Sequence, residues 1–420
     1  MTLLIRGGRV VDPSQGLDAQ ADALVRDGRV AHVGEAVADP PPEAEVIEAA
    51  GLVVAPGLVD LHVHFRQPGQ QWKETIATGS RAAAAGGFTT VVCEPNTRPP
   101  VDAPKMLEGL RRLAARDALV RVYFKACITE GQRGQRVVAV QSLKLAGAAA
   151  LSDDGEPVLD GAVMARALDE ARAHDMVLTP HCEESPVSRQ AAPAPEPYAR
   201  EPELVSRDVA LAARHGGRIH FSHISTADSA RLIAEAKRSG HAVTAEATPH
   251  HLTLSSEDAA ADDANAKMIP PLRSKADVEA VRRALAEGVV DAVASDHAPH
   301  APKEKALPYD DAPFGVIGLE TSLGVVLTEL VHSGLISLEQ AIERMSAAPA
   351  RILGLEAGTL AVGSRADIVV FDPAHEWTVE PDRFLSKSRN CPFAGRTLRG
   401  RAVTTIVGGG VVMREGAIQE

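Results

Sequence analysis

The chain has 420 residues, of which 45% are hydrophobic and 24% are charged, a composition typical of soluble globular proteins with a large core. Its net charge of −12, without a long basic run, argues against binding to nucleic acid or to an anionic membrane. The four cysteines are scattered and form no Cys-x-x-Cys pair, a pattern that argues against a disulfide framework and predicts a reducing, cytoplasmic location.

The two ends of the chain have the pattern of β-structure. Strand–turn–strand patterns occupy residues 3–33, and a strand followed by a hairpin is expected within residues 366–413. The first residues lack the apolar stretch of a signal peptide, and no segment is long and apolar enough to span a membrane. We therefore predict one small β-sandwich domain assembled from residues 1–54 and 356–420.

The middle of the chain, residues 55–355, alternates between short apolar runs and helical stretches. Eight such α/β units are the number that closes a (β/α)8 TIM-type barrel, whose chemistry sits at the carboxyl ends of the strands. An open doubly wound sheet is the alternative, but no G-x-G-x-x-G turn follows the first run. The predicted runs are Val53–Phe65, Thr89–Cys93, Val120–Ile128, Ala148–Ser152, Met176–Pro180, Ile219–Ile224, Ala242–Ala247 and Val289–Ala294.

Histidines and aspartates stand at the ends of these runs. His62 and His64 close the first run, and residues i and i+2 of a strand point to the same face. A lone His-x-His pair is a weak signal, but further side chains of the same kind end later strands. Nitrogen and carboxylate ligands without thiolate suit zinc, with manganese or cobalt as alternatives, and a carboxylate can bridge two ions. These further candidate ligands are Asp153, Asp154, His181, His223 and Asp296.

A set of motifs covering nearly the whole chain resembles the type I bacterial enzymes of the dihydroorotase family, in the amidohydrolase superfamily. The first motif, Gly57–Gly69, contains the His-x-His pair and is followed by Arg66-Gln67-Pro68-Gly69. The later motifs resemble those of the family in the same order, and they are more specific together than any one alone. They are Glu94–Thr97, Ser152–Gly155, Pro180–Glu183, Ser222–Thr226, Thr248–Leu252, Ser295–His300, Pro313–Gly315 and Asn390–Phe393.

The resemblance implies reversible hydrolysis of the cyclic amide of dihydroorotate to N-carbamoyl-aspartate, a reaction of de novo pyrimidine biosynthesis. It implies Zn²⁺ as the cofactor, with two ions favoured over one. His62 and His64 would bind one ion and His181 and His223 the other, with Asp154 as the bridge. Asp296 would bind metal and act as the general base. The substrate carboxylate would be held by Arg66, Asn96 and His300.

The bridging ligand has an alternative, because many relatives use a carbamylated lysine there. Lys144 is the nearest lysine, but it lies ahead of the fourth strand and not at its end. We therefore favour a carboxylate, and the alignment of the Ser-Asp-Asp-Gly motif favours Asp154 over Asp153. Three further histidines are expected to be structural or to pack behind the site: His220, His250 and His251.

Three positions depart from the family pattern. Gln67 stands where Glu is usual, Glu94 where an apolar Met is common, and Ile269 where Asn is expected. None removes a metal ligand, so these changes bear on the substrate more than on the reaction class. Residues 301–311 are expected to form either an active-site loop or a plain surface loop, and the stretch 181–223 looks shorter than in relatives.

Two other functions compete with this interpretation. Hydantoinases and allantoinases share the metal chemistry, but a simple hydantoin has no carboxylate for Arg66 and Asn96 to bind. A non-catalytic scaffold subunit of the pyrimidine pathway would be expected to lose metal ligands, and this chain keeps them all. We expect a small-molecule substrate and no nucleic-acid or membrane partner, with a homodimer and an association with aspartate transcarbamoylase left open.

Overall fold

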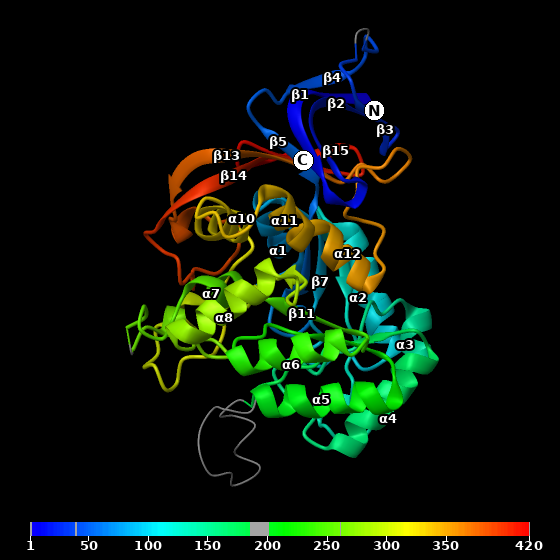
Figure 1. Ribbon diagram of the computed structural model, residues 1–420, viewed down its shortest axis with the longest axis vertical. Coiled ribbons are helices and arrows are strands. Elements are labelled where there is room, and N and C mark those ends of the chain that lie inside the picture. The colour runs from blue at the N-terminus through cyan, green and yellow to red at the C-terminus, as the bar shows by residue number, and fades with distance from the viewer. Residues whose placement is uncertain (1, 38–39, 185–200, 261, 420) are drawn as a thin grey trace.

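The computed structural model describes residues 2–37, 40–184, 201–260 and 262–419. Part of the 181–223 stretch that looks shortened, residues 185–200, lies outside the described residues. Strands from both ends of the chain share one sheet at one end of the molecule, and the parallel strands with their helices make up the rest (Figure 1). Among the described residues, none of the helices combines the length and hydropathy needed to cross a bilayer.

The sheet formed by the two chain ends has nine strands in the order β16-β15-β14-β13-β5-β1-β2-β3, with β4 paired to β1. The first strand pairs with the second in an antiparallel register that places Leu3 opposite Val25. Its buried side chains, Ile5 and Val10 among them, form a core of their own. The strands are β1 (Thr2–Asp12), β2 (Leu17–Arg26), β3 (Arg29–Gly34), β4 (Glu45–Glu48), β5 (Val53–Pro56), β13 (Ile368–Thr378), β14 (Thr397–Val407), β15 (Gly410–Arg414) and β16 (Ala417–Ile418).

The middle of the chain forms two parallel sheets, of orders β6-β7-β8 and β12-β11-β10-β9. Parallel bridges join them on both sides, through Leu151 between the strands of residues 121–124 and 177–178, and through Val63 with His297. The fourth predicted strand is present only as these single bridges at Leu151. The strands are β6 (Leu58–Val63), β7 (Phe88–Cys93), β8 (Arg121–Phe124), β9 (Val177–Leu178), β10 (Arg218–Phe221), β11 (Val243–Ala247) and β12 (Ala292–Val293).

Helices follow the parallel strands, which confirms the predicted α/β class. Several begin at side-chain caps that satisfy free backbone N–H groups: Thr75 caps the first helix and Asp160 accepts from Ala162 N at 2.7 Å. The α-helices are α1 (Ile76–Ala85), α2 (Pro104–Asp117), α3 (Val140–Ala146), α4 (Gly161–Ala173), α5 (Glu201–His215), α6 (Ala227–Arg238), α7 (Pro249–Thr253), α8 (Lys275–Ala286), α9 (Pro302–Lys305), α10 (Ser322–Val326), α11 (Leu338–Ile342) and α12 (Ala348–Leu353).

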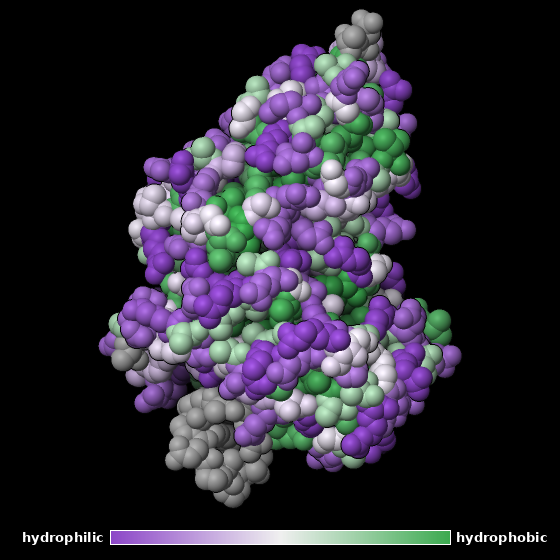
Figure 2. Space-filling view, in the orientation of Figure 1, coloured by the Kyte–Doolittle hydropathy of each residue, from purple (hydrophilic) through white to green (hydrophobic). Residues whose placement is uncertain are grey.

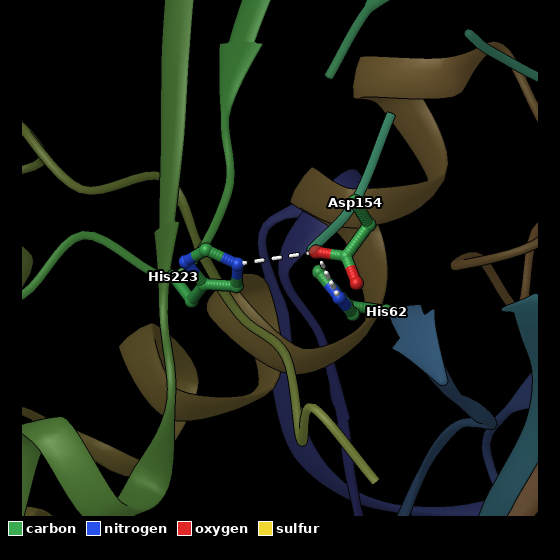
Figure 3. A group of neighbouring side chains, drawn as sticks. All are labelled: His62, Asp154 and His223. Carbon is green, nitrogen blue, oxygen red and sulfur yellow. Dashed lines mark hydrogen bonds and ion pairs between the residues drawn. The ribbon is translucent and has the colours of Figure 1, made fainter. Parts of the chain in front are cut away.

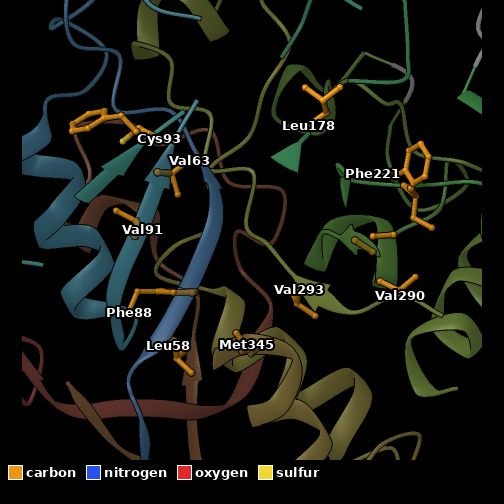
Figure 4. Packing of buried hydrophobic residues seen from close by; sticks show 14 of the residues in the cluster. Leu58, Val63, Phe88, Val91, Cys93, Leu178, Phe221, Val290, Val293 and Met345 are labelled. Atoms are coloured by element: carbon orange, nitrogen blue, oxygen red, sulfur yellow. The ribbon is translucent and has the colours of Figure 1, made fainter. Parts of the chain in front are cut away.

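The largest hydrophobic core lies among the parallel strands and the helices that cover them. Phe88 and Val91 of β7 and Phe221 of β10 belong to this one buried cluster (Figure 4). Hydrophilic residues cover most of the face seen in Figure 2, with hydrophobic residues visible as patches between them. The apolar runs predicted from the sequence are therefore the interior of the fold, and the strand ends carry the buried polar groups.

Candidate metal centre

The candidate ligands lie together at the carboxyl ends of the parallel strands, where the sequence predicts them. Three residues of this region have backbone angles that side chains other than glycine rarely adopt: φ is 57° at Arg66, 34° at His223 and 45° at Asp296. Such left-handed conformations cost free energy and cluster at functional sites. The backbone at these strand ends is therefore strained, and the strained conformations set the directions of the Arg66, His223 and Asp296 side chains.

Asp154 occupies the centre of the cluster. Its Oδ1 lies 3.3 Å from His62 Nε2 and 3.4 Å from His223 Nε2, and Figure 3 shows both contacts meeting at this one oxygen. His181 Nδ1 is 3.3 Å from the same oxygen and 3.0 Å from His223 Nε2. One carboxylate therefore meets imidazoles from three different strand ends.

A second group shares His62 with the first. His64 Nε2 lies 3.1 Å from Asp296 Oδ1 and 3.5 Å from Asp154 Oδ2, while His62 Nε2 lies 3.7 Å from Asp296 Oδ1. Ligand atoms in two buried sets, His62–Asp154–His223 and His62–His64–Asp296, are close enough to hold a metal ion. The two sets lie side by side, and Asp154 reaches both with its two oxygens.

The spacing of these atoms fits a tetrahedral ion. Zinc bonds of about 2.0–2.2 Å place neighbouring ligand atoms roughly 3.3–3.6 Å apart, close to the separations around Asp154. The hydrogen-bond partners of the two histidines in this pair are also consistent with metal binding. His62 and His64 each direct Nδ1 to a protein oxygen, on Glu246 at 3.0 Å and Asn96 at 2.9 Å. Each Nε2 lone pair therefore faces carboxylate oxygens, an arrangement that a cation stabilises. The residues present thus fit a metal ion.

The two aspartates of the Ser-Asp-Asp-Gly motif point in different directions. Asp153 accepts hydrogen bonds from Ile128 N at 2.8 Å, Thr129 N at 3.2 Å and the Thr129 hydroxyl, so its carboxylate is used by the backbone. Burial raises the pKa of Asp153 to about 7, although these bonds act in the opposite direction. Asp154 alone of the two faces the histidines. Lys144 is exposed on α3 and donates to the carbonyl oxygen of His174, so it lies away from this cluster.

The histidines and carboxylates of the cluster shift one another's pKa values. Burial alone raises the pKa of the Asp154 and Asp296 carboxyl groups, but the neighbouring histidines outweigh it and hold both well below the usual range. Burial lowers the pKa of His62, and the charges of Glu94 and Asp154 reverse that effect and raise it. Both aspartates are thus ionised at neutral pH, as metal ligands must be.

A second layer of polar residues orients the ligands. Glu246 of β11 accepts from His62 Nδ1 and, through its other oxygen at 3.1 Å, from His220 Nε2. Asn96 accepts from His64 Nδ1 and donates to Asp154 Oδ2 at 3.0 Å. Glu246 was not among the site residues predicted from the sequence. The signal that could have found it is a charged residue inside an apolar strand, since carboxylates are rarely buried without a partner.

The residues predicted to hold a carboxylate line the side of the site beside His64. Arg66 Nε donates to Pro299 O at 3.1 Å, and its Nη2 lies 3.5 Å from His300 Nε2. Burial lowers the pKa of Arg66 to about 10, so it stays charged at neutral pH. His300 is engaged at both ring nitrogens, with Lys73 Nζ at 3.1 Å and Phe314 O at 2.7 Å. Lys73 in turn pairs with Glu304 at 3.4 Å.

The structure gives a role to Gln67 and a location to residues 301–311. Gln67 Oε1 accepts from Ile76 N at 3.2 Å, so it caps the first N–H group of α1, a role that Glu would also fill. The 301–311 segment contains α9, and Glu304 of this helix contacts Lys73, the partner of His300. Nothing in the structure explains the change at Ile269.

The family model described as "Amidohydrolase family" matches residues 53–412. The chain belongs to the amidohydrolase family. Its similarity to dihydroorotases is also extensive: that of Citrifermentans bemidjiense is 47% identical over 423 residues, covering 98% of this chain and 99% of that protein. The dihydroorotase of Pelotomaculum thermopropionicum is 46% identical over 430 residues, covering 100% of both. The predicted resemblance to this group is thereby confirmed.

Among solved structures, the chain is similar to the L-hydantoinase (dihydropyrimidinase) from Arthrobacter aurescens, with a TM-score of 0.89 and 27% identity over 100% of this chain and 97% of that one. The dihydropyrimidinase from Brevibacillus agri NCHU1002 has a TM-score of 0.86 and 26% identity, over 100% and 96%. These similarities agree with the α/β architecture and with a family in which metal dependence is typical.

Proposed function

We propose that this protein is a dihydroorotase, a metal-dependent cyclic-amide hydrolase that interconverts dihydroorotate and N-carbamoyl-aspartate in pyrimidine biosynthesis. The observation that carries the proposal is the combination of the metal-ligand cluster around Asp154 with a half-buried guanidinium, Arg66, beside it. Full-length identity of 41–47% to dihydroorotases supports the same conclusion.

The proposed metal ligands are the side chains that converge on Asp154. His62 and His64 would hold one zinc ion, His181 and His223 the other, with Asp154 between them and Asp296 beside the first. When bound, zinc supplies Lewis-acid polarisation of the amide carbonyl and activation of water. The protein's own part is to orient these groups, through Glu246 and Asn96, and to move the proton.

Asp296 is the proposed general base. Its carboxylate is ionised, buried and 3.1 Å from His64 Nε2, so it can accept a proton from the attacking water and deliver it to the departing ring nitrogen. The unusual φ of 45° fixes the direction of its side chain. The histidines around it keep its proton affinity low, which favours return of the proton to the leaving amide.

Arg66 would bind the ring carboxylate of the substrate, since its planar fork matches a carboxylate. Asn96 and His300 are proposed to border the same carboxylate. The Asn96 amide is bonded to His64 and Asp154, and both ring nitrogens of His300 have protein partners. Both residues would therefore act mainly by orienting the groups around the carboxylate. A hydantoin lacks this carboxylate, so the structural likeness to hydantoinases does not favour them as the function.

The finer architecture belongs to the same proposal. We infer that the two parallel sheets and the bridges between them form a (β/α)8 barrel over residues 55–355, and that residues 1–54 and 356–420 form the β-sandwich domain. A cytoplasmic location, a homodimer and association with aspartate transcarbamoylase are expectations from the family resemblance.

Substrate preference tests the proposal directly. Metal-free protein, prepared with a chelator and then loaded with zinc, is given dihydroorotate, hydantoin and allantoin in parallel. We expect ring opening of dihydroorotate only, lost on chelation and restored by zinc. Turnover of hydantoin or allantoin without turnover of dihydroorotate would contradict the substrate assignment. Failure of zinc to restore any activity would contradict the metal assignment.

A further inference from the structure

A buried ion pair lies behind the candidate metal centre. Glu94 follows β7 and Lys125 follows the neighbouring strand β8, and both side chains are fully buried. The strands are paired in parallel with Cys93 opposite Phe124, so the two charged residues occupy the next position of the same register. Lys125 Nζ donates a short hydrogen bond to Glu94 Oε1. Neither charge has a role in the chemistry described above.

The ion pair reaches the metal centre through His62. Glu94 Oε1 lies 3.5 Å from His62 Nδ1, and Glu246 Oε1 lies 3.0 Å from the same nitrogen. Two buried carboxylates therefore face one ring N–H, which can donate a good hydrogen bond to only one of them. The shorter distance assigns that bond to Glu246, and it leaves Glu94 to its partner Lys125.

The charge of Lys125 determines which of the two carboxylates accepts the hydrogen bond from His62 Nδ1. Burial lowers the pKa of Lys125, but the charge of Glu94 and that of Glu246 more than offset this, so the ammonium is retained. The ammonium at Glu94 Oε1 neutralises this carboxylate. Removing it would leave Glu94 as an uncompensated anion in a dry site, where it would compete with Glu246 for the imidazole of His62.

We propose that Glu94 and Lys125 are a positioning pair that fixes the His62 imidazole on Glu246, and so aims its Nε2 at the metal. The inference rests on the proposed metal centre. It also accounts for Glu94, which stands where an apolar residue is common in the family. A carboxylate on β7 is tolerated here because β8 supplies its counter-ion, and the two residues are expected to be replaceable only together.

A double-mutant cycle with zinc affinity as its readout tests the pair. The variants are Glu94→Met, Lys125→Met and the combination of both, and zinc binding is measured by competition with a chromophoric chelator. Each single variant should bind zinc about 10–100-fold more weakly, the usual effect of losing a residue that orients a metal ligand. The double variant should return to within about 3-fold of the parent, because replacing both members of a buried pair by apolar residues is tolerated.

A matched control separates positioning from general stability. Arg121, on the same strand β8, pairs with Asp367 at 2.6 Å, and neither contacts a candidate ligand. Arg121→Met should lower the thermal midpoint without changing zinc affinity. The visible spectrum of the cobalt-loaded protein gives a second readout, and it should change in the Glu94 and Lys125 single variants but not in the control. If a methionine variant does not fold, Glu94→Gln and Lys125→Gln provide the same comparison with smaller changes in shape.

The possible results separate the two proposals. Unchanged zinc affinity and cobalt spectrum in folded single variants would overturn the positioning pair, as would losses that simply add in the double variant. Absence of zinc binding by the parent protein would instead overturn the proposed metal centre.

Discussion

The two sides of the candidate site are built in different ways. On the histidine side, the Nε2 atoms of His62 and His64 lie 3.3 and 3.5 Å from the two oxygens of the Asp154 carboxylate. On the cation side, Arg66 and His300 are already bonded to backbone oxygens of Pro299 and Phe314. In the proposed function, the histidine side binds the metal and provides reactivity, and the cation side binds the substrate carboxylate and provides selectivity.

The largest effect is expected on the histidine side, from Asp154→Asn. Loss of one charged oxygen shared between two ligand sets should remove one metal equivalent and reduce turnover by at least about 1,000-fold, since metal activation supplies much of the chemistry. Metal content by elemental analysis and turnover of dihydroorotate check this.

Lys144→Ala is the matched control for the bridging role. This lysine is exposed and bonds to the carbonyl oxygen of His174, so the variant should keep both metal equivalents. Retained metal in the Asp154 variant together with loss of metal in the Lys144 variant would reverse the assignment of the bridge.

The next largest effect is expected on the cation side, from Arg66→Met. Hydrogen bonds to charged groups contribute about 1.5–3 kcal/mol each, so loss of a bidentate contact should raise KM for dihydroorotate by about 100-fold or more. Metal content should stay at the parental value, because Arg66 contacts no candidate ligand atom in the structure. A variant that lost metal and kept its KM would show that the two sides are not separate.

A smaller effect is expected at Glu320, whose carboxylate is bonded to the backbone of residues 385 and 386. Burial raises the pKa of Glu320 to about 7, against the hydrogen bonds from Ser386 N and Leu385 N. The folded state therefore holds this proton more tightly than the unfolded state between about pH 4.5 and 7. Unfolding free energy should fall as pH rises through this window, by at most about 3 kcal/mol from this group.

Glu320→Gln tests that pH dependence, because the amide oxygen can still accept from the backbone but carries no charge. The advantage of the variant in thermal midpoint should grow from pH 5 to pH 8. A constant difference across this range would contradict the raised pKa of Glu320.

The smallest effect is expected at Gln67. Its side-chain oxygen accepts from Ile76 N at the start of α1, so Gln67→Ala should lower the unfolding free energy by about 0.5–1 kcal/mol, the lower range for a lost helix cap. Gln67→Glu keeps the acceptor and should be as stable as the parent with unchanged KM. A large change in KM for the Glu variant would instead assign Gln67 to substrate recognition.

The contrast between the two sides also explains what the sequence could reveal. His62, His64, His181 and His223 were predictable because strand periodicity and the strand-end rule of parallel α/β folds place them together. The choice of Asp154 over Asp153 came from the family motif, and its physical cause, the backbone bonds that occupy Asp153, needed the structure.

Other parts could not be predicted because they depend on contacts between distant segments. Glu246 and Lys125 look like isolated charges in apolar strands until the fold brings them to His62 and Glu94. The family resemblance implies that His300 binds the substrate, but no pattern in the sequence around it predicts that Phe314 and Lys73 contact its ring nitrogens. The pairing of the two chain ends in one sheet was predictable, because both ends had strand patterns.

The proposed ligands can be located by anomalous X-ray diffraction at the zinc edge, from crystals of the zinc-loaded protein. We expect two peaks on either side of the Asp154 carboxylate, one against His62 and His64 and one against His181 and His223. A peak bound by Asp153 or by other side chains, with no density at Asp154, would contradict this assignment.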